Sequence, residues 1–425
     1  MRQTVRQKNE QGIAYAVFPF GNSRQMFLAG EPEEQYVNQA DLSGQVKNLL
    51  GNVKSVCESQ RFAQNTAGIC HIFLANIAMR ELVLQRIHEI CPHILGAVTI
   101  VSQAPVSGAL IALELWTMTG DESHFFSEQK TEEDAGKDLC EDRPLGLTSV
   151  AEFDDMRWFF IGRASPETSP AVGAYARSRE AFRCLDDMLV DAGFGLDQLL
   201  RTWIYQGNLV LAEGETQRYK ELNRARTDAF ENVSFLEFFL PENHEGAVYP
   251  ASTGIGADDF DVVISALGLD TNRDDVIVVP LENPNQTSAF DYGAEYSPQS
   301  PKFSRAMAVA VDDACLIFVS GTASITNSES RYPDDPAKQT EQTLDNIADL
   351  IAGENLARHG IEGFSCGLEN LESVRIYIKR RSDLELVRGV CERRLPDIPT
   401  VYTIADVCRE ELLVEIEGIA VARRT

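Results

Sequence analysis

The sequence predicts an α+β protein made of three tandem copies of one module, each a mixed β-sheet with two helices packed on one face. Two observations support this prediction. First, three strand-like segments that each end in glycine lie far apart in the chain, at residues 26–30, 158–162 and 317–321. Second, each is followed by the same order of helix-like and strand-like segments. Self-similarity of this kind indicates repeated structural units.

The first element after each glycine-ended strand has the pattern of an amphipathic helix. Its apolar residues recur at spacings of three and four, which places them on one helix face. Related strings occur in the three segments: LLGNVKSV, FRCLDDML and TLDNIADL. The predicted helices span residues 45–57, 178–192 and 339–351.

The second half of each module is predicted to contain a strand, a helix and a closing β-rich hairpin. The strands span residues 70–76, 202–207 and 374–379. The second helices span residues 79–91, 214–230 and 383–394. The hairpins span residues 98–118, 249–267 and 400–422. This order favours a mixed sheet with both helices on one face.

The three copies are expected to pack against one another. The chain has 425 residues, enough for two to four domains, and the modules are expected at residues 1–120, 150–270 and 280–425. A sheet covered by helices on one face leaves its other face bare. Three such faces could bury one another around a pseudo-threefold axis. We therefore expect an intramolecular pseudotrimer that is a monomer in solution, since the threefold surfaces are already used.

Composition excludes several classes of function. The formal net charge of −27 repels polyanions, so nucleic acid is not an expected partner. The nine cysteines, without a CxxC motif, suit reduced thiols in a cytoplasmic protein. No apolar run approaches the length of a membrane span, and no membrane partner is expected. The six histidines lack metal-ligand spacing and no nucleotide-binding glycine motif follows a strand, so neither metal nor cofactor is expected.

The third module resembles a known superfamily. It contains the strings FVSGTASI, QTLDNIADLI, VRIYIKR and LLVEIEGIAVARR, by which it is similar to the YjgF/RidA superfamily. Members of that superfamily are usually homotrimers of one YjgF/chorismate-mutase-like module, with sites at the clefts between subunits. The resemblance is weaker in the second module and weakest in the first, which we expect to be a degenerate copy.

A more specific resemblance spans the second and third modules. The strings NRART, YPASTGIG, LENPNQTSAFDY, YSPQSPKFSRAM and ADVCREELLVEIEG resemble the chorismatase branch. Chorismatases hydrolyse chorismate to pyruvate plus either a dihydroxycyclohexadiene carboxylate or 3-hydroxybenzoate. The resemblance implies this activity without a cofactor, on a small dicarboxylate of the chorismate type.

Two glutamates are the candidate catalytic residues. Glu415 and Glu417 lie two apart on a probable strand, so both carboxylates face the same side. Two acids held close together and away from water cannot both ionise easily, so the pKa of one rises. Such an acid can protonate the methylene of an enol ether at neutral pH. The resemblance points to Glu415 as this acid. Glu417 is either a second catalytic residue or one partner of a salt bridge across modules.

Only the third module contains this pair. The first module has Ala112 and Glu114 at these positions, and the second has Val263 and Ser265. We therefore expect one principal site, lined by the second and third modules.

A dicarboxylate requires fixed cations, and arginine grips a carboxylate in two bonds. Basic residues cluster on the second helices of the second and third modules, where most are expected to be solvated. The candidates for substrate contact, chosen largely from the resemblance, are Arg224, Arg226 and Arg388. Lys379 either joins them or simply flanks its strand.

The resemblance also suggests two wall positions, and four hydroxyl groups are candidate donors. Cys408 and Gly321 are expected on opposing walls, a pair that the resemblance associates with the 3-hydroxybenzoate-forming subtype. A lone cysteine is otherwise a buried small hydrophobe. Hydroxyl groups that could orient a substrate, or simply be satisfied polar groups, belong to Tyr377, Tyr402, Ser320 and Thr253.

Two alternatives are retained. One is a RidA-like hydrolase of imines or enamines, although residues 399–402 lack the carboxylate-binding arginine of the deaminase branch. The other is a non-catalytic module that binds small carboxylates.

Overall fold

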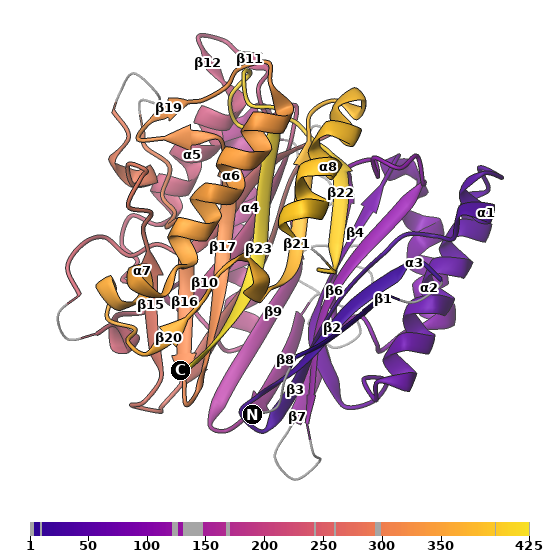
Figure 1. Ribbon diagram of the computed structural model, residues 1–425, viewed down its shortest axis with the longest axis horizontal. Coiled ribbons are helices and arrows are strands. Elements are labelled where there is room, and N and C mark those ends of the chain that lie inside the picture. Colours follow the sequence, from indigo (N-terminus) through magenta and orange to yellow (C-terminus); the bar gives the residue numbers. More distant parts are fainter. Residues whose placement is uncertain are drawn as a thin grey trace.

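The computed structural model describes residues 4–8, 11–120, 126–130, 148–166, 171–241, 244–258, 261–293, 299–395 and 397–424. Its three large sheets and their helices repeat one arrangement along the chain (Figure 1). The first module, in indigo and violet, has the sheet order β1-β2-β3-β6-β4-β5. Its strands are β1 (Val5–Lys8), β2 (Ile13–Phe20), β3 (Ser23–Gly30), β4 (Thr66–Leu74), β5 (Ala97–Ser102) and β6 (Ile111–Gly120). Its helices are α1 (Glu34–Val37), α2 (Leu42–Ser59) and α3 (Arg80–Ile90).

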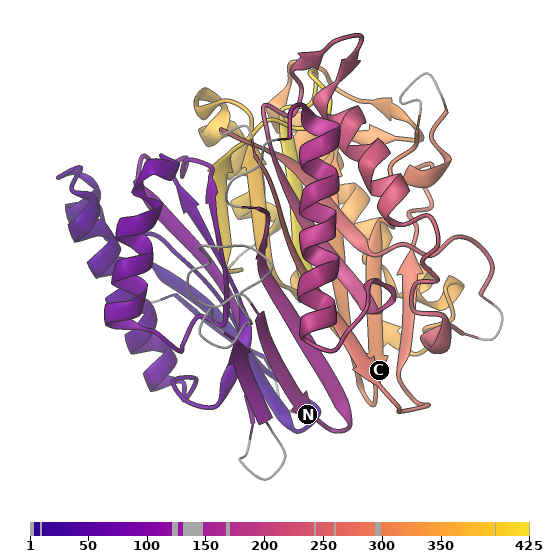
Figure 2. The same ribbon diagram turned by 180° about the vertical axis from the view of Figure 1, so that it is seen from behind.

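The second module has the sheet order β13-β10-β14-β9-β8-β7. Its strands are β7 (Phe126–Lys130), β8 (Thr148–Phe153), β9 (Met156–Ala164), β10 (Leu199–Gly207), β13 (Ala251–Ala257) and β14 (Val262–Thr271). Helices α4 (Ala174–Asp191) and α5 (Arg218–Ala229) cover its outer face, which Figure 2 shows from behind. Its small hairpin consists of β11 (Ala212–Glu213) and β12 (Thr216–Gln217).

The third module has the sheet order β15-β16-β17-β23-β21-β22. Its main strands are β15 (Ile277–Leu281), β16 (Ala306–Val311), β17 (Ala314–Ala323), β21 (Leu371–Ile378), β22 (Thr400–Ile404) and β23 (Val414–Arg424). Its helices are α6 (Pro336–Ile351), α7 (Gly353–Arg358) and α8 (Leu384–Arg394). Its short strands are β18 (Ile325–Thr326), β19 (Glu329–Ser330) and β20 (Phe364–Ser365).

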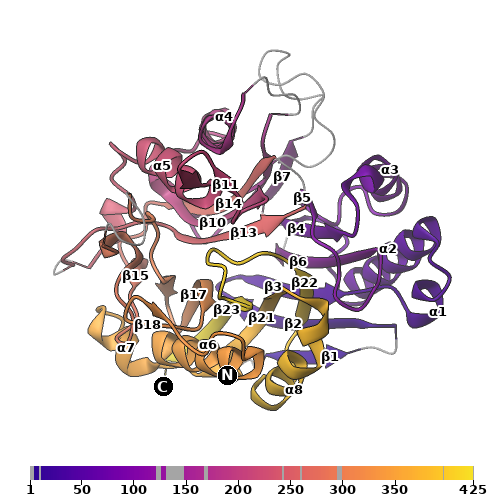
Figure 3. The same cartoon turned by 90° about the horizontal axis from the view of Figure 1, so that it is seen from above.

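The bare sheet faces meet at the centre, as the sequence predicted. Seen from above, the helices lie outside and the three sheets face inward (Figure 3). The Trp116 ring of the first module lies 5.2 Å from the Phe160 ring of the second and 5.7 Å from the Phe318 ring of the third. One hydrophobic cluster contains residues of all three modules. Burial of this apolar surface is the main force that joins them.

The three interfaces are equivalent and run head to tail. Strand β5 of the first module packs on β9 of the second, β13 of the second on β17 of the third, and β22 of the third on β3 of the first. Each module thus presents the strand after its second helix to the hairpin of the next. The predicted intramolecular pseudotrimer is therefore confirmed as the fold.

The predicted closing hairpins were wrong. In the first module β5 and β6 do not pair with each other but flank β4, with β5 parallel and β6 antiparallel to it. The other modules repeat this arrangement. The crossover helix returns the chain to the sheet edge in the parallel direction, so the last strand must insert on the other side.

One helix boundary also differs from the prediction. The helix expected at residues 214–230 begins at Arg218, because residues 212–217 form the β11–β12 hairpin. Gly214 occupies its tip with φ +67°, a conformation that favours glycine.

The eight cysteines in the described ranges are free thiols. Among the residues with assigned positions, no helix is long and apolar enough to cross a membrane.

Candidate active site

A cavity of about 330 Å³ lies where the second module meets the third. Strand β13 forms one wall and the end of β17 another, and the interface between these strands is one of the three pseudo-equivalent module contacts. Its size is in the range of small-molecule sites. It is lined by Gln217, Tyr219, Lys220, Asn223, Ser252, Gly254, Tyr292, Pro301, Phe303, Arg305, Gly321, Ala323, Ile325, Cys408, Arg409, Glu410, Glu411 and Glu415.

Glu415 reaches this cavity from β23. Across the sheet it pairs with Ala323 of β17 and Tyr377 of β21. The register between β17 and β23 shifts around Ser320 and Gly321, which forms a bulge beside the glutamate. A Cβ atom on Gly321 would overlap Oε1 of Glu415 and come within 3.0 Å of its Cδ. The glycine is therefore required for this position of the carboxyl group.

The environment of Glu415 keeps its carboxyl group protonated. Burial and the neighbouring Glu417 raise its pKa to about 8, although Arg201 and Arg305 act in the opposite direction. No hydrogen bond to the Glu415 carboxyl is formed by the part of the chain that the structure describes. It is thus a proton donor at neutral pH that faces the cavity.

Cys408 contributes a wall and not a thiolate. Burial raises the pKa of its thiol to about 12, so the sulfur stays protonated at neutral pH. Gly321, the other residue predicted as a wall, also lines the cavity.

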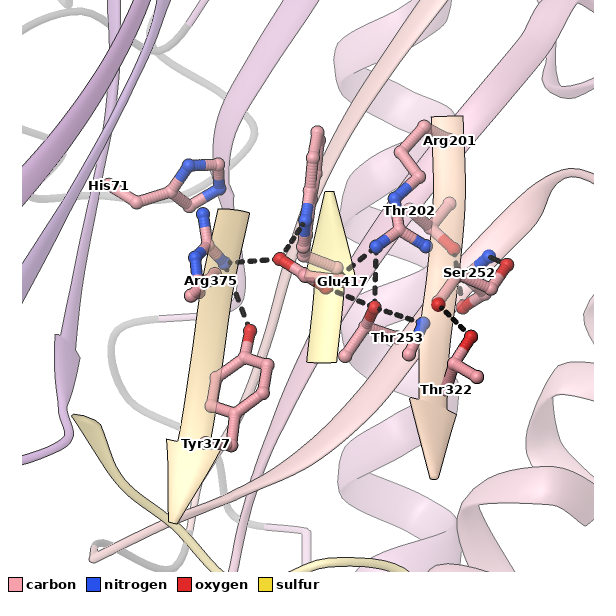
Figure 4. A network of polar contacts seen from close by, with 12 residues as sticks. His71, Arg201, Thr202, Ser252, Thr253, Thr322, Arg375, Tyr377 and Glu417 are labelled. Carbon is pink, nitrogen blue, oxygen red and sulfur yellow. Dashed lines mark hydrogen bonds and ion pairs between the residues drawn. The ribbon is translucent and has the colours of Figure 1, made fainter. Parts of the chain in front are cut away.

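Glu417 lies behind the cavity in a buried polar network (Figure 4). Its Oε2 accepts from Arg201 at 2.7 Å and from the Thr253 hydroxyl, and its Oε1 accepts from the Trp203 indole at 2.9 Å. Arg375 forms an ion pair with Oε1 at 3.0 Å. The structure therefore places Glu417 in a salt bridge across modules, the second of its two predicted roles.

Thr253 and Ser320 connect this network to the cavity wall. The Thr253 hydroxyl accepts from the Gly321 N–H at 2.9 Å and from Arg201, and it donates to Glu417. The Ser320 hydroxyl accepts from the Ser252 N–H at 2.8 Å and donates to the Ser304 carbonyl at 2.6 Å. Both predicted hydroxyls therefore position the bulge and do not themselves line the cavity.

Arg305 supplies a cation that sequence reasoning missed. It is 4% exposed, donates to the Thr287 carbonyl at 2.8 Å and to the Tyr292 hydroxyl at 2.6 Å, and lines the cavity. Its Nε has no hydrogen-bond partner among the described residues. A buried donor without a partner is costly, and an anionic ligand would satisfy it.

Helix α5 contributes a second unsatisfied donor. Asn223 lines the cavity and its Nδ2 is buried without a described partner, while its Oδ1 accepts from Arg226 at 2.7 Å. Arg226 also donates to Ser252 at 3.3 Å, so it supports the wall from behind. Lys220, one turn earlier on the helix, lines the cavity as well.

The remaining predicted residues lie away from the cavity. Arg224 is exposed, pairs with Glu221 at 3.0 Å and stacks on the Tyr175 ring. Lys379 donates to the Glu410 carbonyl at 2.8 Å. The helix face that carries Arg224 points to solvent, whereas Arg226, two residues on, points inward.

Three further predicted residues serve other interfaces. Tyr377 is buried at the axis, where its hydroxyl accepts from Arg375 at 3.1 Å. Arg388 lies over the Tyr402 ring at 5.9 Å and pairs with Glu385 at 3.1 Å. Tyr402 belongs to β22, which packs on the first module and not on the second.

The strand registers explain why this interface is open. The positions equivalent to Gly254 of β13 are Ile100 of β5 and Tyr402 of β22. Gly254 has no side chain, so space remains at this interface that a large side chain occupies at each of the other two. At the position of Glu415 the other modules have Ala112 and Val263.

The sequence signal for the missed residues was present. Arg305, Phe303 and Tyr292 lie in or beside the strings that carried the family resemblance, and Asn223 opens NRART. Those segments form the β15–β16 connection and helix α5, which face each other only after folding.

The described residues include no group of three or more His, Cys, Asp or Glu side chains that could hold a metal ion.

No family model matches the chain. It is 34% identical over 272 residues to a 3-hydroxybenzoate synthase of Streptomyces hygroscopicus, which covers 62% of this chain and 74% of that protein. It is also 34% identical over 261 residues to a chorismatase of Streptomyces rapamycinicus, and this match covers 59% of this chain and 72% of that protein. A crystal structure of a chorismatase has the same fold, with a TM-score of 0.58 and 22% identity over 83% of this chain and 93% of that one. Because these two relatives are each 34% identical to the chain and matched over more than two thirds of their length, the chain belongs to the chorismatase family.

Proposed function

We propose that the chain cleaves the enolpyruvyl ether of chorismate, releasing pyruvate, with Glu415 as the general acid. One observation carries this proposal: a protonated carboxyl group without a described hydrogen-bond partner faces a cavity that also contains unsatisfied cationic and amide donors. The relatives named chorismatase and 3-hydroxybenzoate synthase supply the substrate class.

The acid step requires little more than Glu415. Its proton passes to the methylene carbon of the enol ether, and the positive charge that forms is shared between the neighbouring carbon and the ether oxygen as an oxocarbenium ion. Water adds to that carbon, and the adduct breaks its ether bond to give pyruvate and a ring alcohol, the dihydroxycyclohexadiene carboxylate. For 3-hydroxybenzoate to form, this ring must then lose its other hydroxyl group and a ring hydrogen as one water and become aromatic, which returns the water consumed. An acid with a pKa near 8 is protonated at neutral pH and still able to give up its proton.

The two carboxylates of the substrate require cations, and Arg305 is the strongest candidate. Its buried Nε lacks a partner, and a guanidinium can hold a carboxylate in two parallel bonds. Lys220 and Arg409 line the same cavity and add positive charge against the formal net charge of −27. Asn223 also lines the cavity, and its buried Nδ2, which has no described partner, is available to donate a hydrogen bond to the substrate.

The ring product is either 3-hydroxybenzoate or a dihydroxycyclohexadiene carboxylate. 3-Hydroxybenzoate and pyruvate together contain the atoms of chorismate, whereas the other product pair contains those of one additional water. Gly321 and Cys408 on the cavity wall favour 3-hydroxybenzoate, because the resemblance associates this pair with that subtype.

The test is direct. The purified chain is incubated with chorismate, pyruvate is measured with a coupled dehydrogenase, and the ring product is identified by chromatography and mass. We expect pyruvate and one ring product in equal amounts. A folded protein that releases no pyruvate above the uncatalysed background would reject the proposal.

A further inference from the structure

Around the pseudo-threefold axis, one side-chain hydrogen bond recurs at each module interface. Figure 4 labels three of the residues that take part, His71, Arg375 and Glu417. In each module, one side chain on the strand between the two helices (β4, β10 or β21) forms a hydrogen bond with a side chain on the last strand of the next module (β14, β23 or β6). The three pairs are His71–Ser265 at 3.0 Å, Trp203–Glu417 at 2.9 Å and Arg375–Glu114 at 3.0 Å.

The strand registers establish that these positions are equivalent. Within its own module, each acceptor lies directly across the sheet from that module's donor. The cross-strand pairs are His71 with Glu114, Trp203 with Ser265, and Arg375 with Glu417. The pairs therefore form a closed ring in which every module holds the next.

The charges on this ring are not distributed evenly. The first and third modules contribute carboxylates, Glu114 and Glu417, and the second contributes only Ser265. Arg375 holds Glu114 through two nitrogens, at 3.0 and 3.3 Å, and also pairs with Glu417 at 3.0 Å. Arg201 adds a second cation at Glu417. Burial and both arginines lower the pKa of His71 well below its ordinary value, so His71 is neutral.

The ring lies next to the acid. Glu417 is two residues from Glu415 on the same face of β23, and Thr253 links its carboxylate to the Gly321 N–H beside Glu415. The charged and titratable groups that face Glu415 or line its cavity come from six elements: Glu417, Arg201, Tyr377, Arg305, Tyr292, Tyr219, Lys220, Cys408, Arg409, Glu410 and Glu411.

We propose that Glu114 of the first module is a positioning residue for the site formed by the other two modules. By neutralising Arg375, it leaves the negative charge of Glu417 to act on the Glu415 carboxyl, which then keeps its proton. This role rests on the proposed function, since it concerns the acid of that reaction. It also gives the first module, whose described residues do not line the cavity, a part in catalysis.

The sign of the effect follows from the charge count. The positive charges of Arg375 and Arg201 balance the negative charges of Glu114 and Glu417. Removal of the Glu114 charge leaves an excess positive charge in the network that holds Glu417, two residues from Glu415. That charge offsets the effect of Glu417 and favours the ionised form of Glu415, so the pH range in which Glu415 is an acid becomes narrower. Interactions among buried charges are screened less than those at the surface, so they extend beyond directly paired groups.

The experiment is the pH dependence of kcat/KM for pyruvate release, which reports the free enzyme. We expect the alkaline limb of the Glu114→Gln profile to move to lower pH by roughly half a pH unit or more. Glu114→Asp, which keeps the charge but draws it back from Arg375, should fall between Gln and wild type. Ser265→Ala is the matched control, because it changes the equivalent ring position without changing charge, and its limb should not move.

The outcomes are distinguishable. Wild-type protein that releases no pyruvate would reject the proposed function itself. Active Glu114→Gln with an unmoved limb, or an equal shift in Ser265→Ala, would reject only the role of Glu114. If Glu114→Gln does not fold, Glu114→Asp is measured instead. An alkaline limb at the wild-type pH in Glu114→Asp would then overturn the proposal. A purely structural role would lower stability without displacing the limb.

Discussion

Glu415 and Glu417 lie two residues apart on the same face of β23, yet only Glu415 lines the cavity, whereas Glu417 is bound by Arg201 and Arg375. The difference arises from their neighbours. Glu417 meets cations at the axis, and Glu415 meets the bulge at Gly321, where no side chain competes for space. One of two adjacent carboxylates is thereby held as a fixed anion and the other as an acid.

Glu415→Gln is expected to lower kcat for pyruvate release by at least about 100-fold, since general acid catalysis contributes roughly 10²–10⁴-fold. Glutamine has the same shape but no transferable proton. Steady-state kinetics with chorismate measures the effect, and circular dichroism verifies the fold. Retention of wild-type kcat would exclude Glu415 as the acid.

The same substitution should stabilise the protein above neutral pH. The pKa of Glu415 is about 8 in the folded state and near 4.5 when unfolded. The folded state therefore retains a proton that the unfolded state releases, and the free energy of unfolding decreases as pH rises from 4.5 to 8. Glu415→Gln lacks this decrease.

Thermal unfolding of both proteins between about pH 5.5 and 8.5 should show a Tm difference that grows with pH in favour of the variant. A difference that is constant with pH would contradict the raised pKa.

Gly321→Ala should lower kcat at least about tenfold, because the new methyl group would overlap the Glu415 carboxyl and displace the acid. Gly254→Ala is the matched control in the same cavity. Its Cβ would lie 3.1 Å from Cε2 of Tyr219, a ring edge that can yield, so a smaller loss is expected. Equal losses would indicate that cavity volume, and not the position of Glu415, decides the rate.

Arg305→Gln should raise KM for chorismate by about tenfold to 100-fold, the effect of losing a charge-assisted carboxylate contact of roughly 1.5–3 kcal/mol. Arg224→Gln tests the position suggested by sequence alone and should change KM less than twofold, because Arg224 is exposed and paired with Glu221. A larger effect at Arg224 than at Arg305 would place the carboxylate site on the outer face of α5.

Much of the fold could be predicted because the copies support one another. The helix near residues 339–351 has a strong apolar stripe, and its counterparts recur in the same order, so all three were found. The closing strands were misassigned as hairpins because sequence neighbours with β character usually pair. Whether a third strand inserts between them depends on the crossover, which leaves no local pattern.

The candidate site was predicted in part. Glu415, Gly321 and Cys408 were found because they lie in strings with a family resemblance, and all three line the cavity. Arg305 and Asn223 were missed because their significance is a buried donor without a partner, a property of the assembled interface. Arg224 and Arg226 show why the sequence did not suffice. They lie two residues apart on α5, but Arg224 faces solvent and Arg226 is buried, and this difference depends only on which face of the helix packs inward.

Closure of the three interfaces within one polypeptide has a consequence for dilution. In a trimer of separate subunits, a cleft between neighbours vanishes when the protein falls below its dissociation constant, and specific activity then falls with concentration. Here the modules that form the cavity are covalently connected, so their effective concentration is independent of the amount of protein present. Activity per chain should therefore remain constant down to the detection limit of the assay.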